Sequence, residues 1–188
     1  MPRQLRIACI GGESTGKSTL AQALAAAVHG IVVTEALRAF VEEHGRTPLR
    51  EEQRSILLAQ RLREEHAANQ HPHAHVICDP ATLMTAVYSQ MYFDDDSLHD
   101  DAAVFARDYD ALLWCRPDIP WVAEPGLHDG PQFRDQADAL LAAWVNELAP
   151  GGCVLEITGA HGRIPLAHQL LKAEFGSVWQ PEAAGQST

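Results

Sequence analysis

Short apolar runs alternate with longer amphipathic stretches along this chain of 188 residues. A short apolar run bounded by turn residues is typical of a strand that is buried on both faces of a sheet. Apolar residues that recur every three or four positions are instead typical of a helix. Five runs meet the first description and predict strands: Gln4–Ile10, Ile31–Thr34, His75–Asp79, Ala111–Cys115 and Cys153–Ile157.

The stretches between these runs have helical patterns. Ser18–Val28 is rich in alanine and leucine, and Leu49–Asn69 carries many charges on one side. In the clearest case, apolar residues recur on one helical face from Phe133 to Leu148. Because strands and helices alternate, we predict an α/β fold of three layers.

The composition adds limits to this picture. Hydrophobic residues make up 46% of the chain, so a core can form without disulfides or metal. We predict one domain over residues 1–179 and a flexible polar tail over 180–188. The 25 acidic residues outnumber the 14 basic ones, and the formal net charge is −11. This balance argues against nucleic acid as a partner, because Lys and Arg must neutralise its phosphates.

The apolar runs and the cysteines bear on membrane association and on the cellular compartment. The longest uninterrupted apolar run, Ala139–Val145, is too short to span a bilayer, so we expect no membrane association. The four cysteines lack the spacing of metal ligands, and each lies in a short apolar segment: Cys9, Cys78, Cys115 and Cys153. We therefore predict buried thiols and a reducing, cytoplasmic compartment.

A glycine-rich loop follows the first predicted strand. Gly11 to Ser18 fits the pattern G-x-x-x-x-G-K-[ST] of the phosphate-binding loop, or P-loop. Several backbone N–H groups must converge on a polyphosphate, so the loop has to curl tightly, and the start of the next helix adds a positive dipole. The motif predicts a nucleoside triphosphate and Mg²⁺, with Lys17 at the β- and γ-phosphates and Ser18 on the metal, and leaves the choice between ATP and GTP open.

The predicted nucleotide contacts in the loop are Gly12, Glu13, Ser14, Thr15, Gly16, Lys17, Ser18 and Thr19. The alternative interpretation is a glycine turn that only opens a helix.

Acidic residues end two other predicted strands. Asp79 closes a run that resembles a Walker B strand, where the acid orients water around Mg²⁺; a cap on the next helix is the alternative. Glu35 and Arg38 lie on one face of the helical turn after the second strand. The carboxylate would accept the proton of an attacking hydroxyl, and the arginine would bind substrate or phosphate. A solvated ion pair is the alternative.

These residues, with the segments around them, resemble the kinase domain of the NadR family, the ribosylnicotinamide kinase that phosphorylates nicotinamide riboside. The similarity runs from about Leu5 to Lys172 and rests on GGESTGKSTLAQALA, TEALRAFVEEHG, ICDPATLMTAVYSQMYF and RPDIPWVAEPGLHDGPQFRDQADALL. It implies a P-loop kinase fold with a five-stranded parallel sheet in the order 2-3-1-4-5. It also implies MgATP as phosphoryl donor and a nucleoside-like 5′-hydroxyl as acceptor.

The resemblance implies roles for further residues. Trp121 matches an aromatic residue that would stack on a flat base or pyridinium, with packing as an equal alternative. Arg134 matches an arginine of a lid segment near 124–138 and would stabilise charge on the transferring phosphoryl group. Arg163 matches the segment that closes over adenine. Asp118 either faces the substrate or caps a proline-rich turn.

The predicted catalytic residues are therefore Lys17, Glu35, Asp79 and Arg134, with Glu35 favoured over Asp79 as the base. The predicted metal ligands are Ser18 and Asp79. The predicted substrate contacts are Glu35, Arg38, Asp118 and Trp121.

Two positions depart from the family pattern. Ala81 stands where the family has the second Asp of D-T-D, and His128 stands where it has Arg after Gly-Leu. Both positions would touch the acceptor or the lid, so nicotinamide riboside is the best single prediction and another nucleoside or small alcohol is an alternative. A nucleotide-dependent switch is the non-enzyme alternative. The sequence indicates no oligomeric state.

Overall fold

Five parallel strands form one sheet in the order β2-β3-β1-β4-β5. The computed structural model describes residues 3–122, 130–148 and 152–181. The strands are β1 (Arg6–Ile10), β2 (Ile31–Thr34), β3 (Val76–Asp79), β4 (Ala111–Cys115) and β5 (Val154–Ile157). The predicted fold class and the predicted strand order are confirmed.

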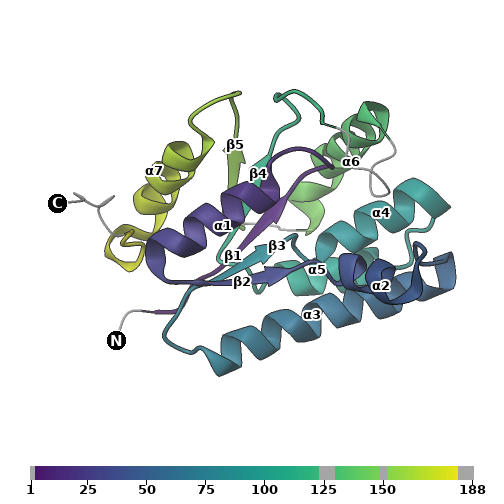
Figure 1. Cartoon of the computed structure of the whole chain (residues 1–188), viewed down its shortest axis with the longest axis horizontal. Helices are drawn as coiled ribbons and strands as arrows, with labels where there is room; N and C mark the ends of the chain where they lie inside the picture. Colours follow the sequence, from purple (N-terminus) through teal and green to yellow (C-terminus); the bar gives the residue numbers. More distant parts are fainter. Residues whose placement is uncertain (1–2, 123–129, 149–151, 182–188) are drawn as a thin grey trace.

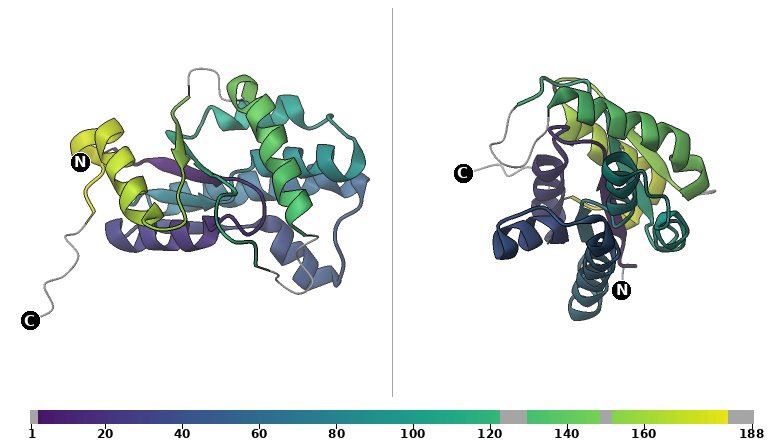
Figure 2. Two further views of the ribbon diagram at one scale, coloured as in Figure 1. Left: turned by 90° about the horizontal axis from the view of Figure 1, so that it is seen from above. Right: turned by 90° about the vertical axis from the view of Figure 1, so that its right-hand side faces the viewer.

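Helices cover both faces of this sheet, so the fold has three layers (Figures 1 and 2). One face is covered by α1 (Lys17–Val28) and α7 (Arg163–Phe175). The other face is covered by α3 (Gln53–Gln70), α4 (Leu83–Phe93), α5 (His99–Ala106) and α6 (Pro131–Leu148). Helix α2 (Ala36–His44) packs beside α3. Two short 3₁₀ turns, η1 (Arg50–Glu52) and η2 (Gly176–Val178), precede α3 and follow α7.

The observed elements differ from the predicted ones mainly at their ends. Strand β1 begins at Arg6 rather than Gln4, and the side-chain Nε2 of Gln4 donates to the carbonyls of His71 (2.7 Å) and Ala74 (2.9 Å). The stretch predicted as one helix from Leu49 divides into η1 and α3. No helix in the described ranges is both long and apolar enough to cross a membrane.

Alternate strand positions fill two apolar cores, one on each face of the sheet. In β1, Ile7 and Cys9 contact the α1/α7 side, whereas Ala8 and Ile10 contact the α3–α6 side. Both faces of each central strand are therefore covered, which explains why these strands form continuous apolar runs. Three of the four cysteines are buried and Cys153 is partly buried, and all four are free thiols.

Trp179 closes the α1/α7 core and is fully buried. Its Nε1 donates a hydrogen bond to His168 Nδ1 (3.2 Å), and its ring stacks on His75 with 5.6 Å between centroids. His75 Nδ1 in turn accepts the backbone N–H of Leu5 (3.1 Å), and its Nε2 lies 3.2 Å from the carbonyl oxygen of Val178. The end of the described chain is thereby tied to its first strand.

Candidate active site

The loop between β1 and α1 curls tightly because three of its residues have left-handed backbone angles. The φ values of Gly11, Ser14 and Gly16 are 137°, 53° and 80°. Such angles are open to glycine and strained for most other residues, which explains the two outer glycines of the motif. The Thr15 hydroxyl donates to the carbonyl of Gly12 (2.8 Å) and stabilises the curl. Helix α1 begins directly after the loop, at Lys17.

Close packing leaves no room for a side chain at the first two glycines. A β-carbon on Gly11 would lie 2.5 Å from the carbonyl oxygen of Cys115, where β4 ends. A β-carbon on Gly12 would lie 2.7 Å from the carbonyl oxygen of Arg134 and 2.9 Å from its Cα. The phosphate loop is therefore held between the end of β4 and the start of α6.

The ammonium group of Lys17 lies against this loop. Its Nζ donates to the carbonyl of Gly12 (2.6 Å), so the positive charge is already placed over the curl. Ser18 and Thr19 are exposed at the start of α1. The structure thus puts the predicted cation and the predicted metal-binding hydroxyl next to each other on the first turn of α1.

Two carboxyl groups lie near each other where β2 and β3 end, and the charge of Lys17 acts on one of them, Glu35. Thr34 at the end of β2 pairs in register with Asp79 at the end of β3, and Glu35 follows directly. Burial raises the pKa of Glu35 above its ordinary 4.5, the negative charge of Asp79 raises it further, and the positive charges of Lys17 and Arg38 lower it. The parallel register therefore brings two predicted catalytic acids together beside the loop.

Tyr88 of α4 belongs to the same cluster, although the sequence analysis did not single it out. Burial raises the pKa of its phenol well above the ordinary value, and the charges of Glu35 and Asp79 add to this because they oppose a phenolate. One helical turn further, the ring of Tyr92 lies 6.3 Å from the ring of Tyr88 and stacks on Phe133 of α6 at 5.7 Å, both distances being measured between ring centroids. The available sequence signal was the i, i+4 spacing of the two tyrosines in the helix that follows β3.

The segment after β4 runs alongside the phosphate loop. The N–H of Val122 donates to the hydroxyl oxygen of Ser14 (2.9 Å), and the carbonyl of Ile119 accepts from Arg134 Nη1 (2.9 Å). Trp121 lies between these two contacts and is partly buried, and Arg134 is 9% exposed. Trp121 and Arg134 therefore lie beside the loop, where their predicted roles require them; the roles themselves stay predictions.

Arg163 and Asp118 form a clasp at the start of α7. Arg163 donates to the carbonyl oxygens of Thr15, Gly159 and Arg116, each at 2.8 Å, and forms an ion pair with Asp118. Asp118 also accepts the N–H of Gly159 (2.6 Å). Because all three guanidinium nitrogens bind protein oxygens, the planar faces of Arg163 are what it can offer to a ligand. These contacts join Asp118 to the loop after β5 and to the start of α7, so both sequence-based alternatives for it, a substrate contact and a cap on the proline-rich turn, stay predictions.

The remaining predicted positions are placed as follows. Arg38 is exposed on α2. Ala81 is fully buried, and its N–H donates to the carbonyl of Cys9 (2.9 Å), so its methyl group lies in the core. His128, residues 124–129 of the lid segment and residues 182–188 of the tail lie outside the described residues.

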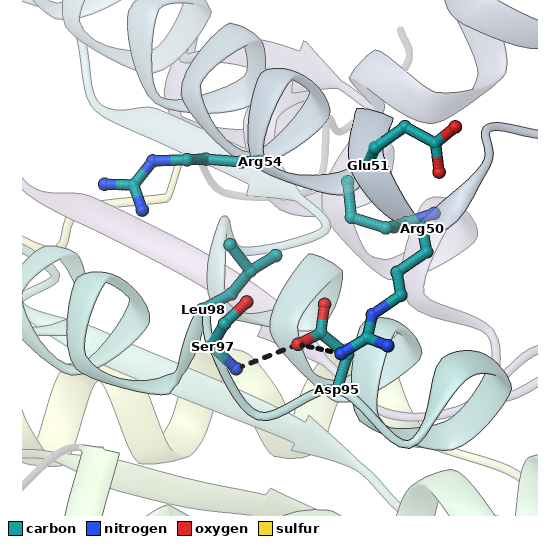
Figure 3. Close-up of a pocket in the computed structure, with 7 residues that line it drawn as sticks. Arg50, Glu51, Arg54, Asp95, Ser97 and Leu98 are labelled. Carbon is teal, nitrogen blue, oxygen red and sulfur yellow. Dashed lines mark hydrogen bonds and ion pairs between the residues drawn. The ribbon is translucent and has the colours of Figure 1, made fainter.

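Two hollows in the described surface lie away from the phosphate loop. One, of about 320 Å³, lies between η1 and the start of α5; Figure 3 shows Asp95 accepting hydrogen bonds from Arg50 and Ser97 there. A second arginine of this hollow, Arg54, pairs with Asp101 (2.8 Å). The other hollow, of about 640 Å³, lies between α4, α5 and α6. Neither is lined by a described residue of the loop, so neither is the candidate site.

The fold closely resembles that of NadR, in agreement with the resemblance seen in the sequence. A NadR protein in complex with NR superposes with a TM-score of 0.75 at 19% identity, covering 97% of this chain and 54% of that one. A NadR protein in complex with NAD and AMP-PNP gives 0.71 at 18% identity, covering 92% and 50%. This chain therefore spans about half the length of the NadR chains.

Smaller kinases share the fold over their whole length. Thymidylate kinase from Candida albicans gives a TM-score of 0.63 at 13% identity, covering 96% of this chain and 95% of that one. Deoxyadenosine kinase from M. mycoides, with bound dATP, gives 0.60 at 12% identity, covering 90% and 100%. The arrangement of sheet, loop and helices is thus the one found in small-molecule kinases.

The family to which the chain belongs follows from its sequence. No curated relative matches the chain significantly. A family model described as AAA domain matches residues 6–160, from β1 to beyond β5, and so includes the phosphate loop and both acid-bearing strand ends. Because this match spans most of the chain, the protein belongs to that AAA domain family of P-loop proteins.

Proposed function

We propose that this protein is a cytoplasmic kinase that transfers the γ-phosphoryl group of ATP to a hydroxyl of a nucleoside-like molecule, with nicotinamide riboside as the first candidate. One observation carries the proposal. The charges of Lys17, at the start of α1, and of Asp79, at the end of β3, both act on the carboxyl group of Glu35, which follows β2. A nucleotide switch needs the loop and a metal-binding acid, but it has no use for a second, partly buried carboxyl group beside them. The likeness to NadR and to smaller kinases supports the same class.

The residues of the loop fit a magnesium-bound triphosphate. The loop is curled by left-handed backbone angles, and the first N–H groups of α1 lack partners within the helix, so N–H groups at this end are available to a phosphate. Lys17 would bind the β- and γ-phosphates. The hydroxyl of Ser18 and the carboxylate of Asp79 would hold Mg²⁺, which prefers oxygen ligands. When bound, Mg²⁺ would neutralise part of the negative charge of the triphosphate.

Glu35 would act as the base for the acceptor. A hydroxyl oxygen of the acceptor attacks the γ-phosphorus, the bond from that phosphorus to the bridging oxygen breaks, ADP leaves, and the hydroxyl proton passes to Glu35. A carboxylate with a raised pKa is a better base near neutral pH than an ordinary one. Asp79 is the alternative base, and Arg38 would bind the acceptor or its phosphate.

Three residues from the opposite side would complete the site. Arg134 would exchange its bond to the Ile119 carbonyl for an oxygen of the transferring phosphoryl group. Trp121 would stack on the flat ring of the acceptor. Arg163 would offer a guanidinium face to adenine, because its nitrogens are already bound. We further propose that residues 1–179 form one kinase domain whose lid comprises residues near 124–138.

Release of ADP, measured with and without an acceptor, tests the proposal. Turnover that depends on nicotinamide riboside, or on another nucleoside of a panel, supports a kinase and identifies its acceptor. Slow hydrolysis that no acceptor accelerates would support a nucleotide switch instead.

The chain offers a matched control for the loop, since Lys17 and Lys172 are its only lysines. Lys17→Met should abolish magnesium-dependent ATP binding in calorimetry, whereas Lys172→Met, at an exposed position on α7, should leave it intact. Unchanged ATP binding in Lys17→Met would rule out the assigned phosphate site.

A further inference from the structure

Two buried polar side chains lie on the face of α3 that packs against the sheet. Gln60 and Glu64 are one helical turn apart and are 2% and 0% exposed. Neither takes part in the reaction proposed above. Burial of a polar group costs free energy unless its hydrogen bonds are made. We therefore expect each of these two side chains to be hydrogen-bonded within the protein.

The amide of Gln60 joins the two backbone segments that carry the site acids. Its Oε1 accepts the N–H of Ala36 (2.7 Å), the residue directly after Glu35. Its Nε2 donates to the carbonyl of Pro80 (3.3 Å), the residue directly after Asp79. One side chain therefore links the end of β2 to the end of β3 just beyond the two carboxyl groups.

This link also leaves the carboxyl group of Glu35 available to the site. Glu35 occupies the N-cap position before the first residue of α2, where Ser, Thr, Asp or Asn would ordinarily cap the helix, and its longer side chain makes no capping bond. Gln60 instead supplies an acceptor to the first N–H of α2 from a different helix. The Glu35 carboxyl group is thus left to interact with Lys17 and Asp79.

Glu64 fixes the orientation of this amide and the start of α4. Its Oε1 accepts from Gln60 Nε2 (3.4 Å), from the Thr82 hydroxyl (2.9 Å) and from the Tyr109 hydroxyl (2.9 Å), which also lies 2.7 Å from Oε2. The Tyr109 oxygen accepts the N–H of Thr82 (2.8 Å). Because Glu64 accepts from the Gln60 amino group, the Gln60 oxygen must face Ala36. The same network holds the backbone three residues after Asp79.

We propose that Gln60 and Glu64 are positioning residues that set the separation between the carboxyl groups of Glu35 and Asp79. The catalytic meaning of that separation rests on the proposed function, whereas the contacts that set it do not. A displacement of about 1 Å in a reacting group can lower a rate about 10²-fold, so loss of the link should lower kcat far more than it alters substrate binding.

Gln53 provides a matched control on the same helix. It is 6% exposed, and its Nε2 donates to the carbonyls of Pro48 and Leu49 (3.4 Å each), so it makes a similar buried amide contact without a link to the site acids. Methionine keeps the length of glutamine and its helix propensity but removes both polar atoms. Both variants should lower the melting temperature, and Gln60→Met by the larger amount, because it leaves the buried N–H of Ala36 and the carboxylate of Glu64 without this partner.

Acceptor-dependent kinetics separate positioning from stability. Gln60→Met should lower kcat about 10²-fold and change the KM for ATP by less than about twofold, whereas Gln53→Met should retain the kcat of the wild type. Equal kcat values for the two folded variants would overturn the inference. If Gln60→Met does not fold, Tyr109→Phe serves in its place, because it removes only the hydroxyl that orients Glu64 and Thr82; an unchanged kcat in that variant would likewise overturn the inference.

Crystal structures of the two glutamine variants test the inference independently of enzyme activity. The separation between the Glu35 and Asp79 carboxyl groups should change in Gln60→Met and stay the same in Gln53→Met. An unchanged separation in Gln60→Met would overturn the positioning role even in an active enzyme. If the wild type shows no acceptor-dependent turnover, the proposed function fails, and the structures still decide whether Gln60 sets the separation.

Discussion

The two faces of the sheet are built differently beneath one site. On the α1/α7 face, an apolar core supports the phosphate loop and Trp179 closes it. On the α3–α6 face, the core also contains buried polar side chains, among them Gln60, Glu64 and Tyr109. An apolar core stabilises the fold but directs no particular side chain, whereas hydrogen bonds have direction. We therefore expect substitutions on the first face to affect stability and substitutions on the second to affect turnover.

The largest effect should come from Arg134 on the α3–α6 side. Arg134→Ala removes the cation that we assign to the transferring phosphoryl group, so kcat should fall about 10³-fold while ATP affinity stays close to that of the wild type. Steady-state kinetics and calorimetry measure the two quantities. Arg107→Ala, at an exposed arginine shortly before β4 begins, is the control and should change neither. A normal kcat in Arg134→Ala would remove the assigned role.

A substitution on the α1/α7 side should show the opposite behaviour. Trp179→Ala deletes a fully buried ring and should lower the free energy of unfolding by about 3–5 kcal/mol, with little change in the kcat of the folded protein. Denaturant unfolding checks the first part. Val104→Ala, at a side chain that is 55% exposed, should change stability by less than about 0.5 kcal/mol. A large kcat loss in Trp179→Ala would contradict the division between the faces.

Tyr109→Phe should have a smaller effect on stability. The change removes one donor to Glu64 and the acceptor for the N–H of Thr82, so two buried groups lose a partner. We expect a loss of about 1–3 kcal/mol in the free energy of unfolding, measured by denaturant titration. A variant as stable as the wild type would show that this network does not hold the start of α4.

The smallest effect should be a pH dependence on the α1/α7 side. Burial lowers the pKa of His75 and of His168 below the ordinary 6.5, although Asp110 opposes the shift at His75. The Nδ1 atom of each ring accepts a hydrogen bond, which a protonated Nδ1 cannot do. The unfolded chain therefore binds more protons, and the free energy of unfolding should fall as pH drops below 6.5 toward the folded pKa values.

Urea unfolding between about pH 5 and pH 7.5 measures this dependence. His168→Asn keeps an acceptor near the place of Nδ1 but cannot be protonated in this range, so its profile should be flatter than that of the wild type. A profile as steep as that of the wild type would assign the dependence to other groups.

The phosphate loop was predictable because its chemistry is contiguous. A strand, two glycines, a lysine and a helix start lie within one short segment, so spacing alone indicates the site. The five strands were predictable for a similar reason, since burial on both faces leaves an apolar run at each of them. The strand order came from the family resemblance and not from these patterns.

The acid side of the site was only partly predictable. Glu35 and Asp79 stand at strand ends and could be found, but Gln60 and Glu64 lie among the polar residues of a charged helix and have no local signal. Their burial follows from how α3 packs against β2 and β3, which depends on contacts distant in sequence. The ion pair between Asp118 and Arg163 was not predictable either, because it joins residues 45 positions apart in the sequence.

The contact between Gly12 and α6 restricts how this molecule can be altered. The atoms of Arg134 nearest to a β-carbon at position 12 are its carbonyl oxygen and its Cα, which every amino acid possesses. No exchange of side chain at position 134 could therefore make room for alanine at position 12. Only a backbone shift at the start of α6 would accommodate alanine there. Redesign of the phosphate loop therefore has to begin with the backbone of α6.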